Sequence, residues 1–302
     1  MGGDQGIVSL IVPAYNEAGR LARTMPRLRG EFTADRGYEV IIVDDGSHDG
    51  TSELVQSQLA DWPGCVLLRM PWNQGKGNAI KAGVGIASGA RIAFMDADLS
   101  AELGDLPRLL EALDDADVAL GSRSIAGSRV SYGQSRSLRK LQSKFFNGVA
   151  CAMANVVASD TQCGFKAFRT DAAKLLFHLC EGKGFAFDVE VIALAQLLGL
   201  RISEVPIQWV ESEGTTIRPI RDPLLMMRDL VRTRRRCLRL ETLMGRRVAE
   251  ASIPLPAPAH WAHRIVGGSP DVVVEISLGD ADTEAFDRAL ATGAPSRGSA
   301  TG

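Results

Sequence analysis

The sequence contains few residues of the kinds that build disulfide frameworks and zinc sites. Its five cysteines are odd in number, scattered and never spaced CxxC, and there are only four histidines. The cysteine pattern favours free buried thiols in a reducing cytosol over a disulfide framework or a zinc site. His48 and His178 are expected to be structural, and "HWAH" (260–263) lies in a proline-rich context that argues against a metal site.

The sequence also lacks a long apolar run and a strong net charge. No run reaches the ~18–20 apolar residues that span a bilayer, and the first residues, "MGGDQG", are not those of a signal peptide. A net charge of −2 gives no global preference for nucleic acid or membrane, so electrostatic arguments must be local. With 302 residues, 45% hydrophobic and 23% charged, we expect a soluble, cytoplasmic protein with one large domain and an appendage.

What the first half does contain is a regular alternation of short apolar and amphipathic segments. Strands are expected at 7–13, 38–44, 65–70, 91–96 and 117–122, and helices near 17–32, 50–60, 75–87 and 103–114. Continuous apolar strands separated by helices predict an α/β fold, with a mostly parallel sheet flanked by helices. Ligands of such sheets bind outside the carboxyl ends of the strands, where this sequence places its polar clusters.

The second half is organised less regularly. Helices are expected at 134–158, at about 185–198 and in a basic segment, 222–247, with a loop at 160–169 and a strand over 202–210. From residue 251 the composition shifts to Pro, Ala, Gly and acidic residues. We therefore expect a catalytic domain over 1–250 and an appendage over 251–302, with one strand in "VVVEISL" and one short helix in "DTEAFDRAL".

Two aspartates follow the expected strand 91–96 with one small residue between them. If residues 91–95 are extended, Asp96 and Asp98 point to the same side, with Ala97 between them. Two adjacent carboxylates repel unless a cation or a proton lies between them. Their hard oxygens suit Mg²⁺ or Mn²⁺ better than zinc, although a solvated loop with two unrelated aspartates is the alternative.

Two further clusters follow strands in the same way. Asp44 and Asp45 in "VDDGSHDGT" can accept hydrogen bonds from a nucleobase or ribose, or the segment can serve only as a helix cap with turn glycines. "NQGKGNAIKAG" is neither a Walker A loop nor a G-x-G-x-x-G fingerprint. Its glycines, the cation Lys76 and a helix N-terminus together favour a diphosphate.

These motifs, in their order and spacing, resemble the inverting family 2 glycosyltransferases, which have the GT-A (Rossmann-like) fold. The resemblance covers roughly residues 7–240 and rests on "VPAYNE", "VDDGSHDGT", "NQGKGNAIKAGV", "DADLS", "GSR" and "DTQCGFKAFR". Through "GFAFDVEVIALAQ" and "VPIQWVESEG" the chain is most similar to the dolichyl-phosphate β-glucosyltransferases and the related dolichyl/polyprenyl-phosphate mannosyltransferases.

The resemblance implies a nucleotide-diphosphate sugar donor, UDP-glucose before others, and a polyprenyl or dolichyl phosphate acceptor. It implies Mg²⁺ or Mn²⁺ held by Asp96 and Asp98. The nucleotide-sugar contacts that it implies are Pro13, Tyr15, Glu17, Asp44, Asp45, Lys76, Asp96 and Ala97. Ser100 stands where the mannosyl branch commonly has a glutamine that aids the metal.

The acceptor phosphate maps onto Arg123 in "GSR" and onto Arg136, or Arg139, in "SRSLRK"; Asp98, Arg123 and Arg136 are the catalytic candidates. A phosphate monoester is already ionised at pH 7, so it needs positioning cations rather than a general base. Arginine suits that task through bidentate bonding. The donor or acceptor loop would contribute Gln162, Lys166 and Arg218, the last in place of the lysine that the glucosyl branch often has near Thr216.

The segment from Arg218 to Arg247 carries ten arginines against three acidic residues, a local net charge of +7, interleaved with leucines and methionines. A basic amphipathic helix of this kind can lie on an anionic membrane surface, although a solvated face over a core stripe also explains the leucines. Nucleic acid is not expected, because no aromatic platform accompanies the charge. Because no segment is long and apolar enough to span a membrane, we expect a separate integral membrane partner.

The sequence thus predicts a metal-dependent, inverting hexosyltransferase that is peripherally associated with the cytoplasmic membrane face. GDP-mannose and UDP-N-acetylhexosamine stay open as donors, and a polysaccharide or small molecule stays open as acceptor. The alternative function that is not enzymatic is that of a nucleotide-sugar sensor or scaffold. The pair Asp96 and Asp98 argues against it, together with Lys76, because a sensor does not need a metal poised at a leaving group.

Overall fold

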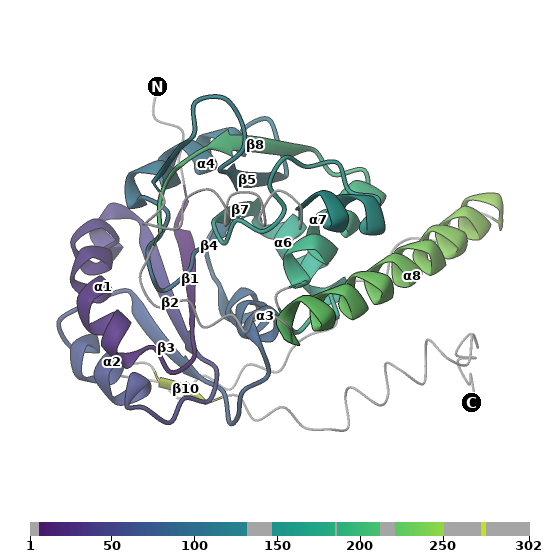
Figure 1. Cartoon of the computed structure of the whole chain (residues 1–302). Helices are drawn as coiled ribbons and strands as arrows, with labels where there is room; N and C mark the ends of the chain where they lie inside the picture. The colour runs from purple at the N-terminus through teal and green to yellow at the C-terminus, as the bar shows by residue number, and fades with distance from the viewer. Residues whose placement is uncertain (1–5, 132–146, 185, 212–220, 251–272, 276–302) are drawn as a thin grey trace, which may run out of the picture.

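The computed structural model describes residues 6–131, 147–184, 186–211, 221–250 and 273–275. Its centre is a twisted sheet in the order β10-β3-β2-β1-β4-β7-β5-β8 (Figure 1). The strands are β1 (Val8–Ala14), β2 (Tyr38–Asp44), β3 (Cys65–Arg69), β4 (Arg91–Phe94), β5 (Val118–Ser122), β7 (Lys166–Arg169), β8 (Ile202–Pro206) and β10 (Val273–Glu275). Every pairing is parallel except those of β7, which runs antiparallel to both β4 and β5.

Helices cover both faces of this sheet, as the continuous apolar strands predict (Figure 1). One face carries α1 (Ala18–Glu31), α2 (Thr51–Leu59) and α4 (Leu106–Ala112), and the other carries α3 (Lys76–Ile86), α6 (Thr170–Leu179) and α7 (Phe187–Leu197). Within β1, Leu10 enters the first core and Ile11 the second. Successive side chains of a strand point to opposite faces, so a fully buried strand supplies two cores at once.

The long basic helix is α8 (Arg221–Glu250), which packs against α7 and then projects from the body of the protein (Figure 1). Its inner side is fixed by Leu230, Thr233 and Cys237, all buried. Among the described residues, none of the helices combines the length and the apolar character needed to cross a membrane.

The segment 160–169, expected to be a loop, ends in strand β7 and leads directly into α6. "KAFR" is too short to carry a periodic pattern, and pairing with β4 and β5 on either side is what makes it a strand. The expected strand 202–210 is two strands, β8 and β9 (Gln208–Val210), and β9 pairs with β6 (Arg129–Ser131) in a separate two-stranded sheet.

Some of the expected helices and strands lie only partly within the described residues. Of the helix expected at 134–158, residues 147–154 are helical, and residues 134–146 lie outside the described residues. Strand β10 falls within the expected "VVVEISL" strand and adds to the edge of the main sheet beside β3. The helix expected in "DTEAFDRAL" and the rest of 251–302 also lie outside them.

Candidate active site

The carboxyl ends of three neighbouring strands bring the expected polar clusters to one edge of the sheet. Strand β1 pairs with β2 on one side and with β4 on the other, and Ala14 is in register with Asp44. The segment after β1 contains Glu17, and the segment after β4 contains Asp96 and Asp98. Residues more than eighty positions apart are therefore neighbours here.

Lys76 and Asp96 form the central ion pair of this edge. The Lys76 Nζ lies 2.6 Å from Asp96 Oδ1 and 5.7 Å from the centre of the Phe187 ring. Burial works to lower the pKa of Lys76, but the carboxylates of Asp96 and Asp188 raise it above its ordinary value. Lys76 is therefore a permanent cation at the start of α3, where the helix dipole adds further positive potential.

Asp98 and Glu17 bring two more carboxylates to the same space. Asp98 Oδ1 accepts a hydrogen bond from the Ser100 N–H at 3.0 Å, across the intervening Leu99, whose φ of 50° is left-handed. Burial raises the pKa of Glu17, and the charge of Asp98 raises it further, while Arg20, its ion-pair partner, lowers it. This concentration of negative charge is the environment in which a cation binds favourably.

The donor set fits a hard divalent cation. Asp96 and Asp98 offer carboxylate oxygens, and neither side chain is fully buried. Gly164 packs against Asp96 so closely that a Cβ there would lie 2.0 Å from Asp96 Oδ2, so only glycine leaves room for the carboxylate. Among the described residues no group of three or more His, Cys, Asp and Glu is placed so that it could hold a metal, so a cation at Asp96 and Asp98 would need further ligands from a bound diphosphate or from water.

Asp44 and Asp45 are buried, at 1% and 2% exposure, and both bond to the protein itself. Asp44 accepts hydrogen bonds from the Ser47 N–H, at 2.9 Å, and from the Ser52 hydroxyl. Asp45 accepts from the backbone N–H groups of Gln74, at 2.7 Å, and Gly75, at 2.8 Å. Burial raises the pKa of Asp45, and these two backbone N–H groups oppose that shift. In this structure Asp45 fixes the loop that leads into Lys76.

The remaining expected nucleoside contacts differ in exposure. Tyr15 is 43% exposed, Pro13 is half-buried, and Ala97 is buried between the two aspartates of the dyad. Arg136, Arg139 and Arg218 lie outside the described residues.

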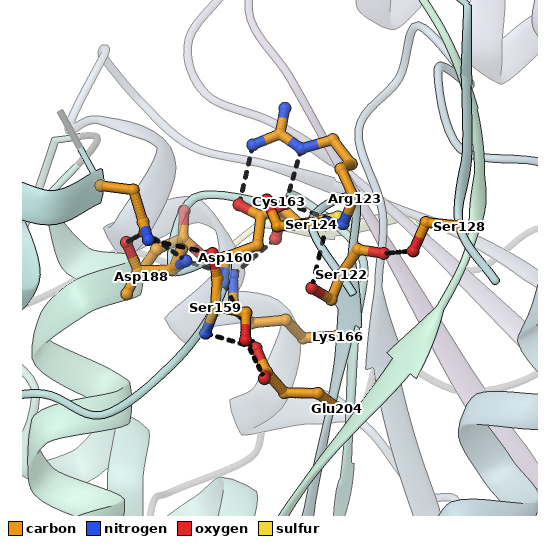
Figure 2. Close-up of polar contacts among 12 residues, drawn as sticks. Ser122, Arg123, Ser124, Ser128, Ser159, Asp160, Cys163, Lys166, Asp188 and Glu204 are labelled. Atoms are coloured by element: carbon orange, nitrogen blue, oxygen red, sulfur yellow. Dashed lines mark hydrogen bonds and ion pairs between the residues drawn. The ribbon is translucent and has the colours of Figure 1, made fainter. Parts of the chain in front are cut away.

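Arg123 is held in a fixed orientation by Asp160. Its Nε and Nη2 donate to the two oxygens of Asp160, at 2.7 and 2.9 Å, and its backbone N–H donates to Asp160 Oδ2 at 3.0 Å. The guanidinium also lies 5.4 Å from the centre of the Trp209 ring. Burial would raise the pKa of Asp160, but Arg123 lowers it below its ordinary value. Figure 2 shows the third guanidinium nitrogen pointing away from Asp160.

Lys166 lies inside the protein, with no exposed side-chain surface. Its ammonium donates to the carbonyls of Thr161 and Cys163, at 3.2 and 2.5 Å, and to Asp188 Oδ1 at 2.6 Å (Figure 2). Two of its three donors therefore fasten the segment that holds the half-buried Gln162, and the third binds Asp188 of α7. On the other side of this segment Glu204 accepts from the N–H and hydroxyl of Ser159.

A small pocket opens beside Asp96. Its lining residues are Met95, Asp96, Ser100, Ala101, Cys163, Gly164, Phe165 and Trp209. The Ser100 hydroxyl is buried and has no hydrogen-bond partner among the described residues. A buried hydroxyl without a partner costs free energy, so it is a polar contact that a bound molecule can satisfy.

Sequence reasoning did not single out Asp160, Gly164, Asp188 or Trp209. Asp160 and Gly164 stand within the quoted "DTQCGFKAFR" motif, and Asp188 within "GFAFDVEVIALAQ", so their place in a motif was the available signal. Their roles depend on contacts with residues far away in the chain, which no local pattern reveals.

Comparisons with known proteins agree with this geometry. Residues 9–177 match the family described as Glycosyl transferase family 2. A dolichyl-phosphate beta-glucosyltransferase of Dictyostelium discoideum is 33% identical over 248 residues, which cover 78% of this chain and 76% of the relative. The human protein of the same description is 32% identical and covers 76% of each chain. An undecaprenyl-phosphate mannosyltransferase of Micrococcus luteus is 34% identical over 68% of this chain and 84% of its own.

Among solved structures, glucosyl-3-phosphoglycerate synthase from Mycobacterium tuberculosis, in complex with Mn²⁺, UDP and phosphoglyceric acid, superimposes with a TM-score of 0.57. It is 19% identical, and the match covers 77% of this chain and 78% of that one. The likeness shows a shared GT-A fold.

Proposed function

The chain belongs to glycosyl transferase family 2, and from that premise we propose that it transfers a hexose from a nucleotide-diphosphate sugar to a polyprenyl phosphate. The observation that carries the proposal is the edge of the sheet where Lys76 pairs with Asp96 beside Asp98. It combines a fixed cation for a diphosphate with two carboxylates for a divalent cation. Relatives named for dolichyl-phosphate and undecaprenyl-phosphate support a lipid phosphate as acceptor.

On the donor side, Asp96 and Asp98 would hold Mg²⁺ or Mn²⁺ together with the diphosphate. When bound, the metal would neutralise the charge that develops on the departing diphosphate. Lys76 would exchange its contact with Asp96 for one with the diphosphate. Pro13, Tyr15 and Glu17 would border the nucleoside, and the unpartnered Ser100 hydroxyl offers a hydrogen bond to a hydroxyl of the sugar.

Asp44 and Asp45 already form hydrogen bonds within the protein, so the proposal assigns them different roles. Asp45 would keep the diphosphate loop in place through Gln74 and Gly75. Asp44 would read the base if its contacts with Ser47 and Ser52 rearrange on binding.

On the acceptor side, Arg123 and Arg136 would position the phosphate, with Arg139 as the alternative to Arg136. The phosphate oxygen is already ionised at neutral pH and can attack the anomeric carbon without a general base, on the face opposite the leaving diphosphate. Attack from that face inverts the configuration. Asp160 keeps the Arg123 guanidinium in one orientation, which reduces the entropy lost when a phosphate binds.

UDP-glucose is the donor we propose, because several of the relatives are named beta-glucosyltransferases. The test incubates the protein with polyprenyl phosphate, Mn²⁺ or Mg²⁺, and labelled UDP-glucose, GDP-mannose or UDP-N-acetylhexosamine in parallel. We expect label to pass into the organic phase from UDP-glucose and EDTA to abolish the transfer. Transfer from GDP-mannose instead would keep the reaction and change the donor.

Two results would separate the alternatives. No lipid-linked label from any donor, with nucleotide binding still measurable, would reject the lipid phosphate and leave a sensor or another acceptor. Arg123→Lys keeps a positive charge opposite Asp160 but removes the fork that bonds a phosphate at two points. If this variant does not raise the KM for the lipid phosphate, the acceptor site lies elsewhere.

We also propose that α8 rests on the cytoplasmic face of an anionic membrane, next to an integral membrane partner. Its exposed side carries an arginine stripe, defined as Arg228, Arg232, Arg235 and Arg239. These positions are three or four residues apart and therefore share one side of the helix. The exposed Met227 and Leu238 offer apolar contacts to the same surface.

Replacing the arginine stripe by glutamine is expected to abolish sedimentation with vesicles of anionic phospholipid. Each arginine near such a surface contributes ~1 kcal/mol, so four replacements should weaken partition by more than about a hundredfold. The matched control replaces exposed arginines on and after α1, which are Arg23, Arg27, Arg29 and Arg36. Equal loss in both variants would mean that membrane attraction is not specific to α8.

A further inference from the structure

The loop that carries Lys76 rests on the backbone of a second segment, residues 181–184. The Gly77 N–H donates to the Lys183 carbonyl at 3.0 Å. A Cβ on Gly75 would lie 2.3 Å from the Lys183 carbonyl oxygen, and a Cβ on Gly77 would lie 2.2 Å from that of Gly182. Backbone therefore packs directly on backbone, and any shift of 181–184 moves the Lys76 loop.

Segment 181–184 is held in place by Glu190 of α7, a residue that is buried at 3% exposure. Glu190 Oε1 accepts the Glu181 N–H at 3.1 Å, and a Cβ on Gly182 would lie 2.8 Å from Glu190 Oε2. Lys81 of α3 adds a second attachment, because its Nζ lies 3.2 Å from the Cys180 carbonyl oxygen.

Arg236 of α8 completes the support. Its Nη1 forms an ion pair with Glu181, and its Nε lies 3.7 Å from Glu190 Oε1. The Arg236 side chain is 17% exposed and that of Glu190 is 4% exposed, so their contact is largely shielded from water, whereas Glu181 lies on the solvent side of Arg236 with 72% of its side chain exposed. Burial is the main reason that the pKa of Glu190 is raised to about 7; the charge of Asp229 on α8 acts in the same direction, and the Gly182 N–H and Lys81 oppose it. A carboxylate in this position depends on its donors and cations to stay charged.

From these contacts we infer that Glu190 and Arg236 are positioning residues for the donor diphosphate. They hold segment 181–184 in the shape on which the Gly75–Gly77 loop lies, and so they place the Lys76 ammonium. The inference rests on the proposed function, because it takes the diphosphate to bind at Lys76. It also links α8, which we propose to lie on the membrane, to the affinity for the donor nucleotide.

Arg236→Met tests this link against a matched control, Arg234→Met. Both variants remove one charge from the same helix, and among the described residues Arg234 pairs with neither Glu181 nor Glu190. The readout is the Kd for UDP with Mn²⁺, measured by calorimetry on the full chain without lipid. We expect Arg236→Met to raise this Kd by about tenfold, the scale of effect of a small displacement at a site. Arg234→Met should leave it unchanged.

The conservative variants separate positioning from general stability. Glu190→Gln can still accept the Glu181 N–H but loses the ion pair, so it should raise the Kd less than Glu190→Ala. In transfer assays the Arg236→Met variant should show a raised donor KM with kcat nearly unchanged, and thermal unfolding shows whether the fold is kept.

Equal UDP affinities for the Arg236→Met and Arg234→Met variants would overturn the inference and leave the proposed function standing. A wild-type protein that binds neither UDP nor GDP would instead overturn the nucleotide-sugar function, and the inference with it.

Discussion

Asp98→Asn is expected to lower the rate of hexose transfer by about a thousandfold or more, because in the proposed function a metal held by Asp98 would supply several kcal/mol of stabilisation to the leaving diphosphate. The change keeps the size of the side chain, and its amide oxygen can still accept the Ser100 N–H. It removes the negative charge that would hold the cation next to Asp96. The measurement is the initial rate of lipid-linked product at saturating donor, over a titration of Mn²⁺.

The control for this variant is Asp115→Asn, the same chemical change at an exposed position after α4. It should transfer sugar at the wild-type rate. The UDP affinity of Asp98→Asn should become nearly independent of Mn²⁺, which gives a second readout without turnover. If the variant keeps more than a tenth of the activity, Asp98 is not a metal ligand of importance.

Lys166→Met is expected to destabilise the protein by ~3–5 kcal/mol, the scale for removing one partner of a buried ion pair. The Asp188 carboxylate would remain buried, with its principal partner gone. The carbonyls of Thr161 and Cys163 would also lose their donor. Equilibrium unfolding in urea measures the loss, and Lys174→Met, at an exposed position of α6, is the control.

Two further measurements assign the effect to the buried pair. The double variant with Asp188→Asn should be less destabilised than the sum of the two single variants, since the uncompensated charge is gone. Burial already raises the pKa of Asp188, so protonation favours the folded state of Lys166→Met. Its stability deficit should therefore shrink as the pH falls. Additive single effects and a deficit that is constant with pH would contradict this account.

Much of the fold and of the donor edge could be read from local patterns. Apolar runs of strand length between amphipathic helices are enough to predict a mostly parallel sheet, because each strand must bury both of its faces. Polar residues directly after such strands gather at one edge of the sheet, because the carboxyl ends of parallel strands all lie at that edge. That is why the sequence alone groups Lys76, Asp96 and Asp98. The arginine stripe of α8 follows equally from helical spacing.

Tertiary structure alone decided the remainder. "KAFR" is a strand only because β4 and β5 pair with it on either side. Lys166 in the same strand lies beneath the site rather than in it, because Asp188, 22 positions away, satisfies its charge. Arg123 takes its orientation from Asp160, 37 positions away. Sequence by itself determined which groups reach the edge of the sheet, since periodicity is local. Which of them are fastened to the protein depends on partners that only folding brings together.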